Sequence, residues 1–374
     1  MTSSRPDSAS REFERLEEEV LAFIDISEDP GEEPFNRLSL SVFEFQFEHN
    51  RPYANYCRSL DPPCLPGDVR HWSQIPAVPT DAFKHFGLRL NTKPGDAAKF
   101  AAVFRTSGTT GERNAPRGEH GFPSLRLYDA SILRAWQDLG LPKLPIRFLT
   151  PAPGDAPDSS LSHMMGVLNR SYNTTGSDAF LVRPDGSVAG APLGSLDAPI
   201  LLAGTALAFL HLLNSDGLPP LPNGSHLLET GGYKGLAIEL DKTEFYEKLS
   251  RASKVGVTDI HNEYSMTELS SQFYCRGLEA PHRGPHWTRV RVIDALSGEP
   301  ATAGSRGFLE IFDLANLASC LALRTADLAL AIESDTSKDK SDRSVDRRTF
   351  KLIGRDPAVL PRGCSRSADE MLGA

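Results

Sequence analysis

The chain has 374 residues, of which 40% are hydrophobic and 24% are charged, and its formal net charge is −9. This is an ordinary globular composition, long enough for two or three modest domains. The basic residues are scattered, which argues against a nucleic-acid-binding protein, because such proteins gather basic residues on one face. Five cysteines without a recurring spacing argue against a disulfide framework and favour a reducing compartment.

Two segments bear on location. Residues 1–12 are polar and carry both charge signs, so they lack the apolar core of a signal peptide. The longest apolar run, residues 196–213, is interrupted by Asp197, Pro199 and His211. A membrane-spanning helix needs about 20 mostly apolar residues, so a buried strand followed by a core helix is the better interpretation. We therefore expect a cytoplasmic protein without a membrane span.

Helical periodicity opens the chain over residues 11–26, and mixed helix follows over 35–60. From about residue 100, short apolar runs alternate with helical patterns. The expected strands cover 101–104, 146–149, 179–182, 200–203, 226–228 and 257–260, and the expected helices cover 122–139, 159–168, 205–213 and 242–252. This alternation predicts an α/β fold in which helices pack on a sheet.

Four further strands, with little helix between them, are expected over 288–293, 308–312, 327–332 and 350–353. They predict a smaller β-rich subdomain. Residues 333–348 are dense in charged and small polar residues and favour an exposed loop. The chain is thus expected to contain a helical region over 1–70, an α/β core over 71–285, a β-rich subdomain over 286–356 and a short tail over 357–374.

A run of small polar residues and glycines follows the expected strand 101–104 and precedes the expected helix. It consists of Thr106, Ser107, Gly108, Thr109, Thr110 and Gly111. Glycines let backbone N–H groups turn toward an anion, and hydroxyls add further donors. The run therefore predicts a phosphate-holding loop, with ATP as its usual ligand, although it lacks the Lys of the Walker pattern. An ordinary polar turn is the alternative.

A second polar segment, residues 261–268, is expected as a loop directly after the strand 257–260. Ligands of α/β proteins bind at the carboxyl ends of parallel strands. There Tyr264 can stack on a base, Thr267 can donate to a phosphate, and Glu268 can bind Mg²⁺, which prefers oxygen ligands. Taken alone, a buried polar turn or a helix cap explains this segment better.

Two later residues complete the set. Asp327 lies at the expected edge of a strand, where a carboxylate can accept hydrogen bonds from both hydroxyls of a ribose. Arg355 follows Gly354 and can meet a phosphate or a carboxylate. Each residue taken alone is equally well explained by an ordinary turn.

In order and spacing, these segments resemble the adenylate-forming ligases, which share a Ser/Thr/Gly-rich loop, a Tyr-Gly-x-Thr-Glu segment, a Thr-Gly-Asp segment and a Gly-Arg segment. Within that superfamily they are most similar to the acyl-protein synthetases of bacterial bioluminescence. The resemblance covers the chain from about residue 75 to its end. The stretches that carry it are residues 75–84, 106–111, 159–164, 228–235, 263–268 and 363–365.

The resemblance implies a ligase that forms a carbon–sulfur bond. A carboxylic acid, a long-chain fatty acid in that family, is activated by ATP as an acyl-adenylate and moves to a protein cysteine as a thioester. It also implies that residues 106–111 hold the phosphates and that the partner is an acyl-accepting reductase or a carrier protein. ATP and Mg²⁺ are the implied cofactors.

By the same resemblance, Tyr264 packs on adenine, Thr267 contacts the α-phosphate and Glu268 binds Mg²⁺. Asp327 holds the ribose, and Arg355 contacts the nucleotide. Ser265 stands where the family has Gly, so its side chain is expected to crowd the nucleotide.

The end of the chain departs from the CoA ligases. Arg113 replaces the Lys that often follows their loop, and the sequence ends 19 residues after Arg355 without a domain carrying a catalytic lysine. The acyl-protein synthetases are short here too and are acylated on a cysteine near the C-terminus, which singles out Cys364. Arg362 and Arg366 flank Cys364 and are expected to lower the pKa of its thiol. An acyl- or aryl-CoA ligase and a non-catalytic homologue that binds nucleotide or an acyl chain remain alternatives.

Overall fold

The structure is a computed structural model that describes residues 8–90, 100–106, 117–173, 179–183, 186–188, 193, 196–231, 241–333 and 345–355. Its helices are α1 Ser8–Ile24, α2 Glu32–His49, α3 Arg51–Ser59, α4 Ala82–His85, α5 Arg126–Asp138, α6 Ser160–Tyr172, α7 Ala206–Asn214 and α8 Lys242–Ser253. Short 3₁₀ turns are η1 Pro66–Asp68, η2 Trp72–Gln74, η6 Val257–Asp259 and η7 Leu314–Asn316.

The strands are β1 Val78–Pro79, β2 Ala102–Arg105, β3 Glu119–Phe122, β4 Ile146–Pro151, β5 Phe180–Val182, β6 Leu201–Thr205, β7 His226–Thr230, β8 Ile260–Tyr264, β9 Phe273–Arg276, β10 His282–Arg283, β11 Thr288–Ile293, β12 Arg306–Asp313, β13 Ala322–Glu333 and β14 Val345–Arg355. Within the described residues, twelve of them form one sheet in the order β11-β12-β13-β14-β10-β9-β8-β7-β6-β4-β5, with β1 paired to β13. β2 and β3 pair separately.

The sheet has a parallel part and an antiparallel part. Strands β5, β4, β6, β7 and β8 pair in parallel. From β8 through β9, β10, β14, β13, β12 and β11 every pairing is antiparallel. Parallel strands need long crossover connections, and the helices α6, α7 and α8 lie in those connections. The expected α/β fold is confirmed.

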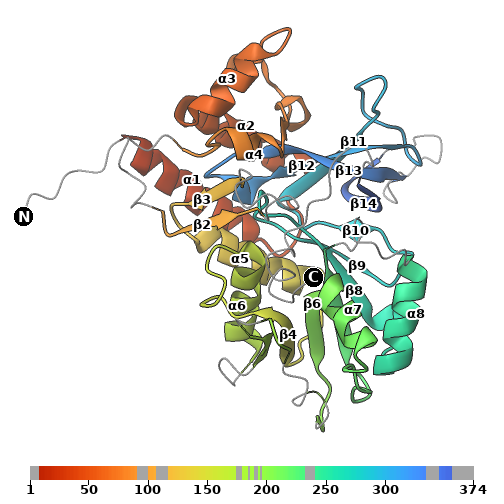
Figure 1. The fold of residues 1–374 in the computed structure, drawn as a ribbon. Coiled ribbons are helices and arrows are strands. Elements are labelled where there is room, and N and C mark those ends of the chain that lie inside the picture. The colour runs from red at the N-terminus through yellow and green to blue at the C-terminus, as the bar shows by residue number, and fades with distance from the viewer. Residues whose placement is uncertain are drawn as a thin grey trace, which may run out of the picture.

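Helices cover both faces of the parallel strands (Figure 1), with α5 and α6 on one face and α7 and α8 on the other. Side chains alternate between faces along each strand. Phe148 of β4 therefore packs in one buried cluster with Met164 of α6, whereas the next residue, Leu149, packs in another cluster with Phe209 and Phe245. Two apolar layers enclose the sheet.

The N-terminal helices pack against the antiparallel part. α1 lies within the region of predicted helical periodicity and buries Leu16, Val20 and Phe23. The buried amide of Gln46 on α2 donates to the carbonyls of Asn316, at 2.8 Å, and Leu317, at 3.1 Å. Its oxygen also accepts from the backbone N–H of residue 321 at 2.9 Å. One side chain thus joins α2 to the turn between β12 and β13.

The predicted strand over 257–260 is wrong in its position. Val257–Asp259 is a 3₁₀ turn, closed by the N–H of Asp259 on the carbonyl of Gly256, and β8 runs from Ile260 to Tyr264. The polar side chains of β8 suggested a loop because their partners come from distant parts of the chain. Asn262, for example, is buried and donates to the carboxylate of Glu229 on β7 at 2.7 Å.

The region around the Ser/Thr/Gly-rich run also differs from expectation. Residues 119–122, the last of them expected to begin a helix, form β3, which pairs antiparallel with β2, and α5 begins only at Arg126. Residues 107–116 therefore connect two strands of a hairpin, not a strand and a helix. The end of the expected loop 333–348 is likewise wrong, because 345–348 belong to β14, which pairs with β13 and β10.

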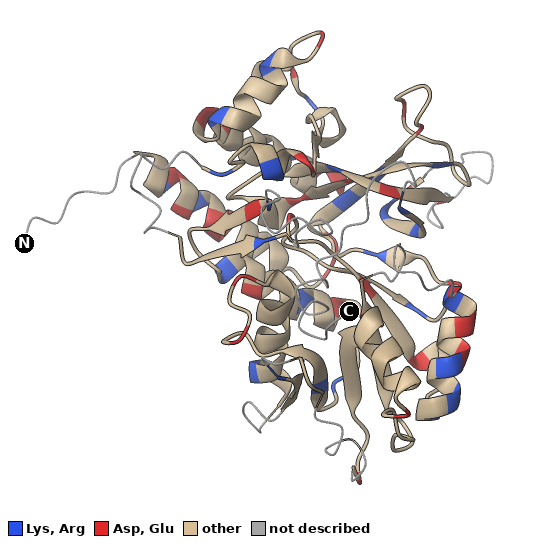
Figure 2. Ribbon diagram, in the orientation of Figure 1, with Lys and Arg blue, Asp and Glu red and all other residues tan. Residues whose placement is uncertain are grey.

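Charge is unevenly distributed over the ribbon (Figure 2). α8 carries both acidic and basic residues along its length, whereas β6 in the middle of the parallel strands carries none. A buried strand contacts helices on both faces, so its side chains are apolar or small. No described helix is both long enough and apolar enough to cross a membrane.

A buried imidazole joins the small hairpin to the large sheet. His120 of β3 lies 2.8 Å from the carbonyl oxygen of Thr267 through Nδ1 and 2.9 Å from the hydroxyl of Ser319 through Nε2. A carbonyl only accepts, so Nδ1 carries the proton and Nε2 accepts from Ser319. Burial lowers the pKa of His120 to about 4, although the bond to Thr267 acts in the opposite direction.

This bond predicts a pH dependence. The unfolded imidazole binds a proton below about pH 6.5, whereas the buried one stays neutral to about pH 4, so stability falls as the pH falls between these values. We expect His120→Gln, whose amide can still donate to Thr267, to reduce the slope of the free energy of unfolding by at most about 1.4 kcal/mol per pH unit. Urea denaturation at a series of pH values measures it. His211→Gln, at an exposed site on α7, is the control, and equal slopes for wild type and His120→Gln would contradict the assignment.

A glycine in β12 is required by close backbone approach. A Cβ atom on Gly307 would collide with the carbonyl group of Ile293 in β11. We expect Gly307→Ala to lower the free energy of unfolding by about 1–3 kcal/mol, because the two strands would have to separate. Gly67→Ala, where an added Cβ meets nothing within 4 Å, is the matched control. Equal melting temperatures for the two variants would show that the strands yield without cost.

Candidate functional site

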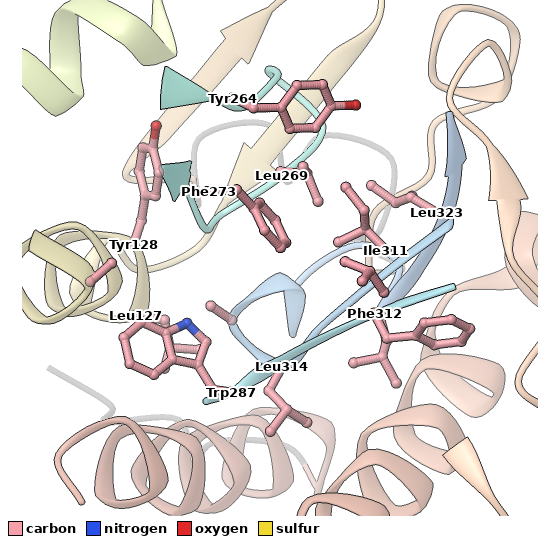
Figure 3. Packing of buried hydrophobic residues seen from close by; sticks show 14 of the residues in the cluster. Leu127, Tyr128, Tyr264, Leu269, Phe273, Trp287, Ile311, Phe312, Leu314 and Leu323 are labelled. Atoms are coloured by element: carbon pink, nitrogen blue, oxygen red, sulfur yellow. The ribbon is translucent and has the colours of Figure 1, made fainter. Parts of the chain in front are cut away.

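The segment between β8 and β9 carries Thr267 and Glu268. Leu269, 1% exposed, anchors it in the core (Figure 3), on the side where Ile311 and Leu323 of the antiparallel strands lie. His120 bonds the carbonyl of Thr267, and the amide of Asn316 donates to the carbonyl of Glu268 at 2.9 Å. The backbone of both predicted site residues is therefore fixed by groups from β3 and η7.

Three predicted residues meet where the sheet changes from parallel to antiparallel. Tyr264 ends β8, and its hydroxyl donates to Oδ2 of Asp327 on β13 at 2.8 Å. Asp327 pairs with Arg355 in the ladder of β13 and β14. Burial raises the pKa of Asp327, and the bond from Tyr264 and the charge of Arg355 partly oppose that shift. Asp327 and Arg355 follow Tyr264 by 63 and 91 positions in the sequence but lie beside it in the structure. The sheet brings them together because β13, β14, β10, β9 and β8 are neighbours in that order.

Glu268 lies within the same electrostatic neighbourhood. It is 6% exposed, and burial raises the pKa of its carboxyl to about 7. The charges of Arg355 and Lys84 pull that pKa downward, and Asp327 pushes it upward. An unliganded carboxyl with a pKa near 7 is poised to ionise when a cation or a cationic group approaches.

Lys84 is a site residue that the sequence motifs did not single out. It lies on α4, which follows the pairing of β1 with β13, and the N–H of Thr80 donates to the carbonyl of Arg324 at 3.0 Å. Burial and the charge of Arg355 lower the pKa of Lys84, whereas Glu268 raises it. Its only sequence signal was its place in the stretch 75–84.

The base of the hairpin loop is closed around Thr106. Its backbone N–H donates to the carbonyl of Gly118 at 2.9 Å, and its hydroxyl accepts from the N–H of Gly118 at 2.7 Å. The guanidinium of Arg117 donates to the carbonyl of Thr106 at 2.6 Å and to Asp158 at 3.1 Å. Thr106 is thus buried and joins the two ends of the loop through hydrogen bonds to Gly118 and Arg117.

Close packing connects Thr106 and Gly118 to the other site residues. A Cβ on Gly118 would lie 3.0 Å from the methyl of Thr106 and 3.2 Å from Cβ of Phe83, the neighbour of Lys84. The ring of Phe83 lies 5.9 Å from that of His120, which bonds Thr267. The hairpin, α4 and the segment before β9 therefore converge.

The structure brings together Thr106, Tyr264, Thr267, Glu268, Asp327 and Arg355. The predicted Ser107, Gly108, Thr109, Thr110, Gly111 and Cys364 lie outside the described residues. Ser265, which was expected to crowd a nucleotide, gives its side chain to a hydrogen bond with Glu263.

The fit of the site to Mg²⁺ depends on its donor set. Mg²⁺ usually takes one or two carboxylates together with phosphate oxygens and water, not a cage of protein ligands alone. The described residues offer one group of three candidate metal ligands, Glu12, Glu48 and His49, and it does not include Glu268. Glu268 beside Arg355 and Lys84 therefore fits a cation that arrives with a polyphosphate and does not fit a free resident ion.

No protein-family model and no curated protein sequence matches this chain. Its structure is similar to that of 2-hydroxyisobutyryl-CoA ligase. In complex with 2-HIB-AMP and CoA in the thioesterification state, that ligase matches with a TM-score of 0.60 and 16% identity, over 88% of this chain and 70% of the ligase.

Two other structures of the same ligase agree. An open conformation with 2-HIB-AMP and CoA gives a TM-score of 0.59 at 15% identity, over 88% of this chain and 76% of the ligase. A postadenylation state with 2-HIB-AMP gives 0.57 at 13% identity, over 86% and 67%. The chain therefore shares the mixed α/β fold of that ligase. Its predicted site residues lie where the parallel and antiparallel parts of the sheet meet.

Proposed function

We propose that this chain activates a carboxylic acid with ATP as an acyl-adenylate and then transfers the acyl group to a thiol. The observation that carries the proposal is the convergence of Tyr264, Glu268, Asp327 and Arg355. Sequence order alone suggested them as a nucleotide site, and four separate strands and turns bring them together. The fold shared with a CoA ligase structure supports the same reaction class.

Each group has a chemical task in this proposal. Asp327 accepts hydrogen bonds from the ribose hydroxyls, and Tyr264, which bonds one of its oxygens, packs against the base. Arg355 and Lys84 place positive charge beside the phosphates. Glu268 would hold Mg²⁺, which supplies further neutralisation of phosphate charge.

In the first step a carboxylate oxygen of the acid attacks the α-phosphorus, and the bond to the β-phosphate breaks, so pyrophosphate leaves. Fixed charges at these oxygens lower the barrier because they need no reorganisation as charge moves. In the second step a thiolate attacks the acyl carbon, and the carbon–oxygen bond to AMP breaks. AMP leaves with the electron pair, and the thiol proton goes to solvent.

We propose Cys364 as the acceptor thiol. Among the described cysteines, Cys57, Cys275 and Cys320 are buried. Burial raises the pKa of Cys57 to about 12 and of Cys275 to about 11, and it raises that of Cys320 strongly. Such thiols are poor nucleophiles. The resemblance to acyl-protein synthetases and the two arginines beside Cys364 favour it over Cys64, whose pKa burial also raises.

The acid remains a prediction. A long-chain fatty acid follows from the resemblance, and a reductase or carrier protein would then take the acyl group. The similarity to a ligase whose structures hold 2-HIB-AMP makes 2-hydroxyisobutyrate a second acid to test. Transfer to CoA is the second candidate reaction, supported by the CoA in two of those structures.

The adenylation half-reaction can be tested by acid-dependent exchange of pyrophosphate into ATP. We expect Glu268→Gln to reduce exchange at least about a hundredfold, since a preorganised charge at the phosphates is lost. Asp327→Asn should mainly raise the KM for ATP. Glu279→Gln is the matched control, because Glu279 is exposed and pairs only with Lys351 among the described residues. Full exchange activity of Glu268→Gln, or no pyrophosphate exchange by the wild-type protein with any acid, would contradict the proposal.

The acceptor can be tested with ATP and a radiolabelled acid. We expect label to stay on the protein, to be released by hydroxylamine and to be absent from Cys364→Ser. Pyrophosphate exchange should survive in that variant. Cys64→Ser is the control and should retain the label. Formation of acyl-CoA without protein label would instead identify a CoA ligase.

A further inference from the structure

A row of polar side chains crosses one face of the sheet beside the proposed site. Thr205, Thr230, Glu263 and Tyr274 are paired in turn across β6, β7, β8 and β9. Directly paired residues share a face, so these four side chains lie side by side. The first three are at the carboxyl ends of parallel strands, and Glu263 immediately precedes Tyr264.

The row is buried but incompletely bonded. Glu263 is 2% exposed and Tyr274 is 4% exposed. The hydroxyl of Thr230 donates to Oε2 of Glu263, and the side chain of Ser265 also bonds this carboxylate. Oε1 of Glu263 and the hydroxyl of Tyr274 nevertheless have no hydrogen-bond partner in the described part of the chain. The same holds for Oε1 of Gln272, a buried residue two positions before Tyr274. Together with the hydroxyl of Ser270, four buried polar groups within twelve residues thus lack described partners.

The opposite face of the same strands provides the contrast. Glu229 precedes Thr230 on β7 and points the other way. Its Oε1 accepts from the hydroxyl of Tyr246 at 2.9 Å and from the amide of Asn262 at 2.7 Å, and Lys242 lies 3.5 Å away. This carboxylate has the hydrogen bonds that a buried carboxylate normally has.

Leaving a buried polar group without a partner costs about 1–3 kcal/mol, and native proteins keep few of them. Local rules of folding are most often broken where a ligand completes the interactions. Burial raises the pKa of Glu263 to about 7, and both burial and Glu263 raise that of Tyr274. Glu263 and Tyr274 are directly paired across β8 and β9, and no hydrogen bond joins their side chains.

The helices over this face supply aromatic surface. The ring of Trp136 on α5 meets that of Tyr274 edge to face, with 6.0 Å between centroids. Tyr128 of α5 and Tyr172 of α6 also lie close enough to affect the pKa of Tyr274. A ligand here would meet aromatic walls together with two acceptors and a phenol.

We propose that the acid activated by this protein carries a hydrogen-bond donor, a hydroxyl or an ammonium group, on its acyl part, and that Glu263 and Tyr274 recognise it. The inference rests on the proposed adenylation and narrows its substrate class. A plain alkyl chain would leave Oε1 of Glu263, Oε1 of Gln272 and the hydroxyl of Tyr274 without partners, whereas a hydroxyl or ammonium group can donate to the two acceptors.

The test compares matched acids in the pyrophosphate exchange assay. Butyrate and octanoate are measured beside their 2-hydroxy, 3-hydroxy and 2-amino derivatives. We expect at least one substituted acid to exceed its plain parent about tenfold or more in kcat/KM, because a site built to bond a polar group rejects the analogue lacking it. If the plain acids are activated as well as every derivative, the inference is wrong while the proposed function stands.

Two Tyr→Phe variants on opposite faces sharpen the test. Tyr246→Phe removes a hydroxyl bonded to Glu229, so it should lower the melting temperature and leave the acid preference unchanged. Tyr274→Phe removes a hydroxyl without a described partner, so it should preserve the melting temperature. It should also bring the ratio of kcat/KM between the preferred substituted acid and its plain parent close to one. Glu263→Gln should abolish any preference for the 2-amino derivatives over their plain parent acids. If Tyr274→Phe lowers the melting temperature and keeps the preference, the hydroxyl is structural. Absence of exchange with every acid removes the proposed function and this inference with it.

Discussion

Two backbone carbonyls, those of Thr267 and Glu268, are held by hydrogen bonds from side chains remote in sequence. His120 reaches the first from the hairpin, and Asn316 reaches the second from the turn after β12. A buried carbonyl must be bonded, and in the described part of the chain these two side chains provide donors. The segment between β8 and β9 is therefore positioned by both the hairpin and the antiparallel strands. The geometry around Glu268 depends on both.

Burial raises the pKa of two nearby carboxyls, those of Asp313 and Glu268, but different groups oppose the two shifts. Asp313, whose pKa is raised to about 6, accepts hydrogen bonds from the hydroxyl of Ser271 and the N–H groups of residues 270 and 315. The raised pKa of Glu268 is opposed by a hydrogen bond from its own backbone N–H and then by the charges of Arg355 and Lys84. Bonds from three other residues fix the carboxyl of Asp313 in the framework, whereas the cations beside Glu268 can also meet the charge of a ligand. Asp313 thus belongs to the framework and Glu268 to the candidate site.

The candidate site lies where the parallel part of the sheet meets the antiparallel part. The parallel strands end at Thr230 and Tyr264, and the antiparallel strands contribute Asp327 and Arg355. Helices cover both faces of the parallel part, so a ligand enters at the carboxyl ends of its strands. The antiparallel ladder then supplies charged side chains across that end. Neither part contains the whole set of groups.

Apolar periodicity predicted the alternation of strands and helices from residue 146 to 253 because those elements bury continuous apolar faces, which local sequence records. Periodicity failed over 257–264 and 119–122. There polar side chains occupy buried strands, and their partners, Glu229 for Asn262 and Thr267 for His120, are distant in sequence. The β14 strand was predicted too short for a related reason, since pairing with β13 and β10 extends it through polar residues.

The sequence by itself determined the α/β pattern and a set of candidate residues, Tyr264, Thr267, Glu268, Asp327 and Arg355, because residue type and order carry that chemistry. Only the tertiary structure decided that Tyr264 bonds Asp327, that Lys84 stands beside Glu268, and that Glu263 and Glu229 face opposite sides of one sheet. Strand order and burial set these relations. Both arise from contacts between residues tens to hundreds of positions apart, which no local pattern encodes.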